Sequence, residues 1–529
     1  MNPMDGKINF DCSEAVIITG ENLTLDEVFQ TAKGRKVQLS AGATEKILKA
    51  YQTVREKIDE KKPVYGITTG FGKLSNIAIN QTQSSQLQKN LIMSHACGVG
   101  KPFSEEITRA IMLLRANTLA NGHSGVNLRV VETLVEMLNR GVHPVVPEKG
   151  SLGASGDLAN LAHVALVIIG MGEAIYQGKR YQGKTAMKKA GIQTIELEGK
   201  DGLGLINGTQ VMTALGSLYI LEAFQLMATA NIAAAMTLEA MLGLTSAMDP
   251  RIHNVRPHFG QSLCASQIRH LLAGSTYVNK TDRVQDAYTL RCVPQVHGAS
   301  FDAMNYVKQV LTVELNSVTD NPIVFPEEGE IISGGNFHGQ PLALALDFLA
   351  IAVAELANIS ERRIERLVNP QLSGLPPFLV KQCGLNSGYM IAQYTAASLV
   401  SENKILAHPA SVDSIPSSAN QEDHVSMGAI SARKAGEIIE NVRQVLAIEL
   451  MCAAQAIDLQ EKGTLGKGTQ IAYNAVREIV PPLTTDRVIY TDIDKMAELV
   501  RDPSFTTGVY QASGLNDEQV DLNGKENAR

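Results

Sequence analysis

Hydrophobic residues recur at helical spacing through the second half of the chain, in segments much longer than a typical strand. Five of these segments are rich in Ala and Leu and are predicted as long helices: residues 206–248, 298–318, 340–368, 387–406 and 426–460. Several are apolar on more than one face, which indicates burial inside a helical bundle or against another subunit.

One apolar stretch, residues 203–221, has the length of a membrane span and carries no formal charge. Polar side chains such as Asn207 and Gln210 interrupt it, and Glu222 follows directly. We therefore expect a buried helix and no membrane partner. The first residues mix charged and polar side chains early, so we also expect no signal peptide.

The first third of the chain mixes short strands, helices and loops. Residues 8–40 have the pattern of short strands around a small helix, and residues 172–200 have that of a hairpin-like insertion. Helical periodicity predicts four helices in this part, at residues 44–62, 84–97, 104–120 and 157–170. Two glycine-rich loops separate them, at residues 63–72 and 150–156.

These patterns predict a mostly α fold with three parts. A small mixed N-terminal region covers residues 1–205, a long-helix bundle with a C-terminal helical region covers 206–515, and a polar tail covers 516–529.

The amino-acid composition bears on oligomeric state, partners and cellular compartment. The chain has 529 residues, of which 44% are hydrophobic and only 19% charged, against a typical charged share of about 25%. Such sparse charge predicts that subunit contacts hide extra surface. The net charge of −7 and the lack of a basic block argue against a nucleic-acid partner. Six scattered cysteines without a CxxC pair fit a reducing, cytoplasmic compartment.

Two other kinds of site are suggested by short patterns and then rejected. Residues 178–185, GKRYQGKT, match the P-loop string. A P-loop requires a buried strand before this string and a long helix after it, but the candidate strand EAIY is short and the helical stretch AMKKAG stops at a glycine. We therefore interpret the match as an exposed hairpin. His163, His338 and His424 lack the spacing of a metal motif, so we predict no metal site.

The second glycine-rich loop carries the strongest chemical signal. It reads SLGASGDLANLAH, with Ala154, Ser155 and Gly156 consecutive. This context resembles the signature of the histidine and aromatic amino acid ammonia-lyases. Seven further blocks extend the resemblance, in order, over nearly the whole chain: YGITTGFG, SHACGVG, LINGTQ, VQDAYTLRC, NSVTDNP, SGGNFHG and ANQEDHVSMG. Asn160 stands where the family more often has Pro.

In that family the Ala-Ser-Gly tripeptide cyclises to a 4-methylidene-imidazol-5-one (MIO), an electrophile that needs no external cofactor. The residue types suit this chemistry. The amide nitrogen of Gly156 has to attack the carbonyl of Ala154, and glycine tolerates the contorted backbone that this requires. Ser155 then supplies the methylidene by losing its hydroxyl as water.

Two positions make the resemblance strongest for the histidine ammonia-lyases. His95 and Glu422 are both present here, whereas phenylalanine- and tyrosine-selective relatives differ at the Ser-His pair and often at the Gln-Glu-Asp run. Polar partners suit an imidazole, whose two nitrogens need hydrogen bonds when buried. The resemblance thus implies elimination of ammonia from L-histidine to give trans-urocanate, the first step of histidine degradation.

The resemblance also implies roles for individual residues. Tyr65 would be the base, and Arg291, helped by Gln285, would bind the substrate carboxylate. Asn207 and Tyr288 would position the amine and polarise the MIO oxygen. His95 and Glu422 would hold the imidazole, and Glu422 could also shuttle a proton. Phe337 would pack near the MIO or the substrate, and Gln421 would contact the substrate. The family forms homotetramers in which several subunits build each active site, and we expect the same here.

Each assignment has a plainer alternative. Arg291 could pair with Asp286 or Asp282, Asn207 could cap the helix that follows it, and His95 could be an ordinary core histidine. Glu422 could belong to a solvated acidic pair. Three functions stay open at this point: a histidine ammonia-lyase, an MIO-dependent lyase or 2,3-aminomutase acting on tyrosine or another aromatic amino acid, and an inactive helical scaffold.

Overall fold

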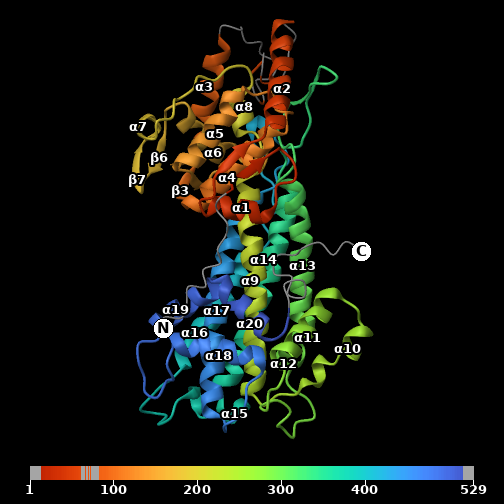
Figure 1. Cartoon of the computed structure of the whole chain (residues 1–529), viewed down its shortest axis with the longest axis vertical. Coiled ribbons are helices and arrows are strands. Elements are labelled where there is room, and N and C mark those ends of the chain that lie inside the picture. Colours follow the sequence, from red (N-terminus) through yellow and green to blue (C-terminus); the bar gives the residue numbers. More distant parts are fainter. Residues whose placement is uncertain (1–13, 61–65, 67–68, 71, 73–82, 516–529) are drawn as a thin grey trace.

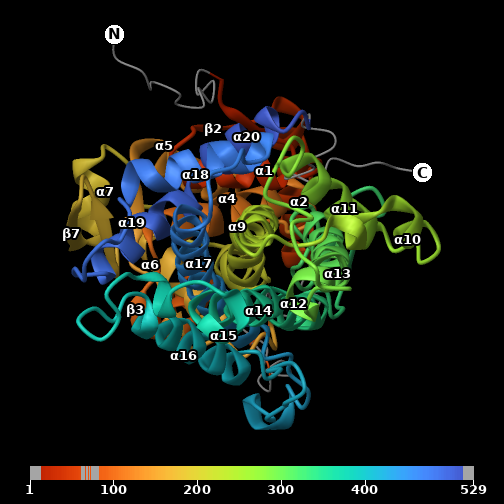
Figure 2. The same ribbon diagram turned by 90° about the horizontal axis from the view of Figure 1, so that it is seen from below.

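Four long helices run side by side along the long axis of the protein (Figures 1 and 2). The computed structural model describes residues 14–60, 66, 69–70, 72 and 83–515. The four helices of this bundle are α9 (Gln210–Ala240), α13 (Val293–Glu314), α14 (Gln340–Val368) and α17 (Gly428–Leu459). A shorter helix, α16 (Met390–Leu406), packs against α14 and α17.

The N-terminal region forms the upper end of the molecule in Figure 1. Its helices are α1 (Leu25–Ala32), α2 (Ala41–Asp59), α3 (Ser84–His95), α4 (Glu105–Ala120), α5 (Leu128–Arg140), α6 (Leu158–Ile168), α7 (Gly183–Lys189) and α8 (Asp201–Ile206). At several of them a polar side chain caps the first turn by accepting a backbone N–H hydrogen bond. Thr24 and Glu27, for example, form a reciprocal capping box at the beginning of α1.

The strands are short and pair in small sheets. They are β1 (Val16–Ile18), β2 (Val37–Leu39), β3 (Val99–Pro102), β4 (Val142–Pro144), β5 (Pro147–Lys149), β6 (Glu173–Tyr176), β7 (Lys179–Gln182), β8 (Ile323–Phe325) and β9 (Glu330–Ile332). β1 pairs with β2 in parallel, whereas β3–β5, β4–β6, β6–β7 and β8–β9 are antiparallel. The first five residues of GKRYQGKT lie in the β6–β7 hairpin, as expected, and the last three begin α7, which has only 7 residues.

Short helices surround the lower part of the bundle in Figure 1. They are the 3-10 helix η3 (Thr245–Met248), α10 (Pro250–Asn254), α11 (Phe259–Leu271), α12 (Tyr288–Arg291), α15 (Pro370–Ser373) and η4 (Pro377–Leu379). The C-terminal helices α18 (Lys467–Ile479), α19 (Tyr490–Arg501) and α20 (Pro503–Ala512) pack in the same part, and η5 (Ser418–Asn420) lies in the loop before α17.

The mostly α prediction is confirmed, and several boundaries are close. The helix expected at 340–368 has the same first and last residues as α14. The helix expected at 426–460 is α17, which covers residues 428–459. The helix expected over 206–248 is α9, which is shorter at both ends: it begins at Gln210, after α8 ends at Ile206, and it stops at Ala240. Asn207, between α8 and α9, has extended backbone dihedrals, which interrupt the helix. The domain boundary near residue 205 stays a prediction.

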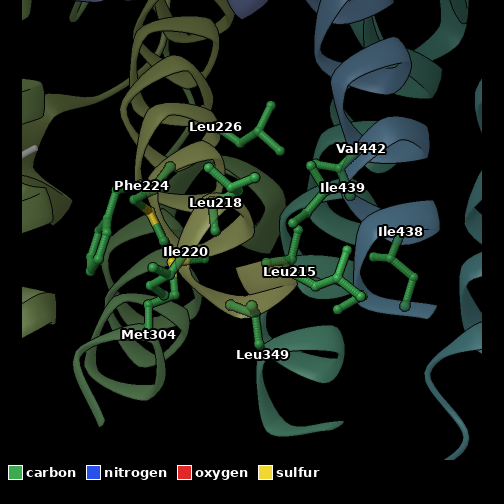
Figure 3. Packing of buried hydrophobic residues seen from close by; sticks show 14 of the residues in the cluster. Leu215, Leu218, Ile220, Phe224, Leu226, Met304, Leu349, Ile438, Ile439 and Val442 are labelled. Atoms are coloured by element: carbon green, nitrogen blue, oxygen red, sulfur yellow. The ribbon is translucent and has the colours of Figure 1, made fainter. Parts of the chain in front are cut away.

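The core explains why α9 and α14 are so apolar. Side chains such as Leu218 on α9, Leu349 on α14 and Ile439 on α17 interdigitate between the helices (Figure 3). By length and composition α9 and α14 resemble membrane spans, yet 78% and 72% of their most apolar windows are buried inside the protein. Their hydrophobicity is accounted for by helix-to-helix packing.

A buried ion pair joins two bundle helices. Glu449 on α17 accepts hydrogen bonds from Arg363 and Ser360 on α14 and from Thr237 on α9. The Arg363 and Glu449 side chains are both fully buried. Because neither side chain contacts water, the attraction between the two charges is what offsets the cost of burying them.

We expect Glu449→Gln to destabilise the protein by about 3 kcal/mol, because it leaves the Arg363 charge buried and unpaired. Thermal unfolding followed by circular dichroism measures the effect. Glu437→Gln, at an exposed position of the same helix, should leave the melting temperature within about a degree. Equal melting curves for both variants would contradict this account of the pair.

Candidate active site

The Ala-Ser-Gly tripeptide lies in the loop between β5 and α6. Ala154 and Gly156 are buried, and Gly156 has φ +68°. A Cβ at Gly156 would lie 2.1 Å from the carbonyl oxygen of Gly208, so a larger residue cannot occupy this position. The loop therefore combines the backbone freedom and the crowding that favour glycine where the MIO requires one.

The residue after the tripeptide anchors it to the start of α9. Asp157 donates its backbone N–H to the Gly208 carbonyl at 2.7 Å. Its carboxylate accepts hydrogen bonds from the backbone N–H groups of Val211 and Met212 at 2.9 and 3.1 Å, and from the Ser151 hydroxyl at 2.9 Å. Burial raises the pKa of Asp157 to about 6, although these three donors favour the charged form.

Asn207 lies beside this anchor, at the end of α8. Its backbone carbonyl accepts a hydrogen bond from the fully buried Arg115 at 2.9 Å. Its side-chain oxygen is buried and has no hydrogen-bond partner within the described residues. The alternative role as cap of the next helix is wrong, since Thr209 occupies that position. The side-chain oxygen of Asn207 is therefore placed to accept a hydrogen bond from a ligand.

His95 is the last residue of α3 and is half-buried. Its Nδ1 lies 2.9 Å from the carbonyl oxygen of Leu91, and because a carbonyl only accepts, Nδ1 carries the proton. Burial lowers the pKa of His95 below its usual value, and the negative charge of Glu422 opposes this shift. The neutral ring thus leaves Nε2 as a hydrogen-bond acceptor.

Two other segments reach the same end of the bundle. Glu422 accepts a hydrogen bond from the Ser417 hydroxyl at 2.8 Å, and Gln421 beside it is exposed. Phe337 is half-buried two residues before Gly339, whose N–H donates to the Gly153 carbonyl at 3.2 Å. The structure therefore brings the segments of Asn207, His95, Phe337, Gln421 and Glu422 to the tripeptide loop.

The remaining predicted residues lie elsewhere. Gln285 and Arg291 line a cavity of about 290 Å³, together with Ser246, Asp286, Cys292 and Gln295. The Arg291 guanidinium lies over the ring of Tyr288, 4.5 Å from its centroid. Asp286 pairs with Arg283, so the alternative that it neutralises Arg291 is wrong. Arg291 forms no ion pair within the described part of the chain, and its buried Nε has no hydrogen-bond partner there.

The two groups of residues lie at opposite ends of α9. The Gly156–Gly208 bridge precedes its first turn, whereas the Asp286 carboxylate accepts the N–H of Leu244 just beyond its last turn. With 31 residues, α9 spans about 45 Å. Figure 1 shows α8 near the upper end of α9 and α12 near the lower end. One chain therefore cannot place Arg291 and Ser155 in a single small-molecule site.

Tyr65, the predicted base, lies outside the described residues. Among the described residues no group of three or more potential ligands could hold a metal ion. His338 and His424, considered above as metal ligands, instead stack with their rings parallel, 5.7 Å apart.

Sequence reasoning missed several residues that shape the loop. Ser426 donates to the Gly153 carbonyl at 2.8 Å, and Arg115 holds the Asn207 carbonyl. Ser426 follows the predicted Gln-Glu-Asp run by only a few residues, so its block was identified and its role was not. Arg115 had a weaker signal, an arginine that follows the apolar run AIMLL in the buried part of α4.

Comparison with known proteins gives one consistent result. Residues 23–478 match the model of the family described as aromatic amino acid lyase. The histidine ammonia-lyase of Alkaliphilus oremlandii is 59% identical over 488 residues, which are 92% of this chain and 96% of that protein. Among solved structures, histidine ammonia-lyase from Trypanosoma cruzi is 44% identical, with a TM-score of 0.89 over 96% of this chain and 97% of that chain. Tyrosine aminomutase from Streptomyces globisporus is 39% identical, with a TM-score of 0.91 over 95% of this chain and 100% of that chain.

Proposed function

Because the chain belongs to the aromatic amino acid lyase family, we propose that it is a carbon–nitrogen lyase that removes ammonia from L-histidine and releases trans-urocanate. The observation that carries this proposal is its 59% identity, over nearly the full length of both chains, with a histidine ammonia-lyase. His95 and Glu422, the residues that distinguish an imidazole site, both reach the tripeptide end of the bundle. The reaction would be the first step of histidine degradation, and a cytoplasmic location stays a prediction.

The tripeptide loop fits an MIO formed from Ala154, Ser155 and Gly156. Gly156 occupies a position with no room for a Cβ, and the loop is anchored by Asp157. When formed, the MIO supplies an electrophile that makes the substrate amine a better leaving group. No external cofactor is needed.

The surrounding side chains bind and orient the substrate. His95 offers Nε2 to an imidazole N–H, and Glu422 holds the other side of the ring or moves a proton. The side-chain oxygen of Asn207, which has no partner in the part of the chain that the structure describes, fits a substrate ammonium. Phe337 and Gln421 contact the substrate, and Tyr65 removes the β-proton.

Arg291, Gln285 and Tyr288 belong to the same reaction but come from another subunit. The buried Nε of Arg291, at the lower end of the bundle, has no hydrogen-bond partner among the described residues, and its guanidinium suits a carboxylate. The α9 length keeps it from the loop of its own chain. A homotetramer that brings these ends together accounts for both facts. Exposed apolar residues along α14, namely Leu344, Phe348 and Ile351, offer surface for such contacts.

The direct test is to incubate the purified protein with L-histidine and follow urocanate by its ultraviolet absorbance. Rapid formation of urocanate and ammonia supports the proposal. The likeness to a tyrosine aminomutase makes product analysis necessary. If histidine is inert and tyrosine yields a β-amino acid, the chain is an aminomutase. If no amino acid reacts, the inactive scaffold is the correct description.

Replacement of His95 tests the imidazole contact. We expect His95→Leu to lower kcat/KM for histidine by about 10- to 100-fold, because a buried substrate N–H loses its acceptor. His270→Leu is the matched control, because the Nδ1 of His270 also faces the carbonyl four residues before it, at 2.8 Å. His270 lies on α11, away from the tripeptide loop, and it does not line the Arg291 cavity. Equal losses in both variants would contradict the contact.

The pH dependence follows from the same residue. Because burial lowers the pKa of His95, Nε2 stays an acceptor at neutral pH and is lost only when the pH falls below the usual histidine range. We expect kcat/KM to fall on that acid side in the wild type. The amide in His95→Gln does not titrate, so the fall of kcat/KM at acid pH should depend on one protonated group fewer than in the wild type. An unchanged acid limb would count against a neutral His95.

A further inference from the structure

The segment Val425–Gly428, at the start of α17, lies directly against the residues that precede Ser155. Met427 donates its backbone N–H to the Leu152 carbonyl at 2.8 Å. The side chains of Val425 and Met427 form a small buried cluster with Ala154. This contact joins parts of the chain more than 270 positions apart, as the Ser426–Gly153 pair illustrates.

Ser426 is the polar centre of this contact. Its fully buried hydroxyl donates to the Gly153 carbonyl at 2.8 Å and accepts the Gly428 N–H at 3.2 Å. The Gly339 N–H also donates to the Gly153 carbonyl, at 3.2 Å. One carbonyl oxygen is thus held by the segments that carry Phe337 and Glu422.

The backbone at this contact is unusually constrained. Met427 has φ +56°, a left-handed conformation that a non-glycine residue adopts only when its surroundings enforce it. On the other side, Gly153 has φ +64°, and a Cβ there would lie 2.2 Å from the Ser426 oxygen. The Gly153 backbone therefore lies so close to Ser426 that no side chain fits between them.

The opposite end of the tripeptide is held just as firmly. Gly156 forms a bridge with Gly208, and Asp157 binds the first turn of α9. The tripeptide is consequently held between the beginnings of two long helices, α17 before it and α9 after it. Ring closure has to bring atoms of Ala154 and Gly156 together, so fixing both flanks favours the reactive geometry over extended ones.

We propose that Ser426 is a positioning residue for cyclisation of the tripeptide; this rests on the proposed MIO. In that reaction the Gly156 nitrogen bonds to the Ala154 carbonyl carbon. The carbonyl oxygen leaves as water with the Gly156 and Ser155 amide protons, and a C=N bond forms. Ser155 then loses its α-proton and its hydroxyl as a second water. Ser426 takes no part in these bonds; it holds the Gly153 carbonyl so that Ala154 faces Gly156.

The test measures the mass of the intact chain, which becomes lighter by two waters on cyclisation. Wild type, Ser426→Ala and Ser426→Cys are expressed and purified identically, and the cyclised fraction is read by mass spectrometry. We expect a severalfold lower cyclised fraction in Ser426→Ala and an intermediate one in Ser426→Cys, which keeps a weaker donor. Activity divided by the cyclised fraction, and KM for histidine, should match wild type.

Ser414→Ala is the matched control. The Ser414 hydroxyl accepts the Val425 N–H at 3.0 Å, so its loss loosens the same segment without touching Gly153. We expect full cyclisation in this variant. Full cyclisation in Ser426→Ala, or an equal deficit in Ser414→Ala, overturns the role of Ser426. A wild-type chain that is not two waters lighter overturns the proposed MIO instead, so the two failures are distinguishable.

Discussion

Ser155→Ala should lower the rate of urocanate formation at least ~1000-fold, because alanine has no hydroxyl to lose and the electrophile cannot form. Binding and proton transfer remain, but neither makes the substrate amine a good leaving group. The assay is urocanate absorbance at saturating L-histidine, with histidine binding measured separately by calorimetry.

The fold should survive this substitution. Ser155 is only partly buried, and alanine fits the space of serine. We therefore expect an unchanged melting temperature and an unchanged elution volume in gel filtration. Wild-type turnover in Ser155→Ala would refute the tripeptide as the source of the electrophile.

Arg291→Ala should lower kcat/KM for histidine by about 100- to 1000-fold, because the substrate carboxylate loses a charge-assisted bidentate partner. Arg291→Lys should recover part of the loss, since a single ammonium keeps the charge without the planar fork. Arg251→Ala is the control. Its side chain is 88% exposed at the same end of the bundle and pairs only with Asp249 among the described residues. An equal loss in Arg251→Ala would point to general damage.

Co-expression of the two inactive chains tests where the residues meet. If each site combines a loop from one subunit with Arg291 from another, random mixing of Ser155→Ala and Arg291→Ala leaves about a quarter of the sites intact. We expect about that fraction of wild-type activity from co-expressed chains, and almost none from separately purified chains mixed without exchange. Absence of activity in the co-expressed sample would contradict a site that is shared between subunits.

Long, periodic segments were the most predictable part of the fold. Residues 340–368 form one helix because the apolar pattern continues without a break until Asn369 and Pro370 end it. The pattern over 206–248 overestimated the length of α9, because hydrophobic periodicity does not mark where a helix begins and ends. Asn207 and Gly208 break the helix through backbone conformation, which depends on Arg115 and on the tripeptide loop far away in sequence.

Which segments meet at the tripeptide loop was only partly predictable from the sequence. The blocks around Ser155, His95 and Glu422 identified residues whose segments the fold brings together. The same reasoning placed Arg291 in that group without showing that α9 separates it from Ser155. Contacts such as Ser426 with Gly153 were beyond sequence reasoning, because they depend on the register of two segments that meet only after folding.

In the proposed assembly, where each site combines residues of two subunits, the length of α9 also has a genetic consequence. A chain with one damaged end spoils one site, so a cell that makes equal amounts of normal and damaged chains keeps half of its sites. A chain with substitutions at both ends inactivates two sites of the assembly. In the same equal mixture a site is then active only when both contributing chains are normal, which is about a quarter of the sites. Such an allele would behave as partly dominant. The helix that separates the two halves of the site thus determines how far one defective copy diminishes the function of its normal partners.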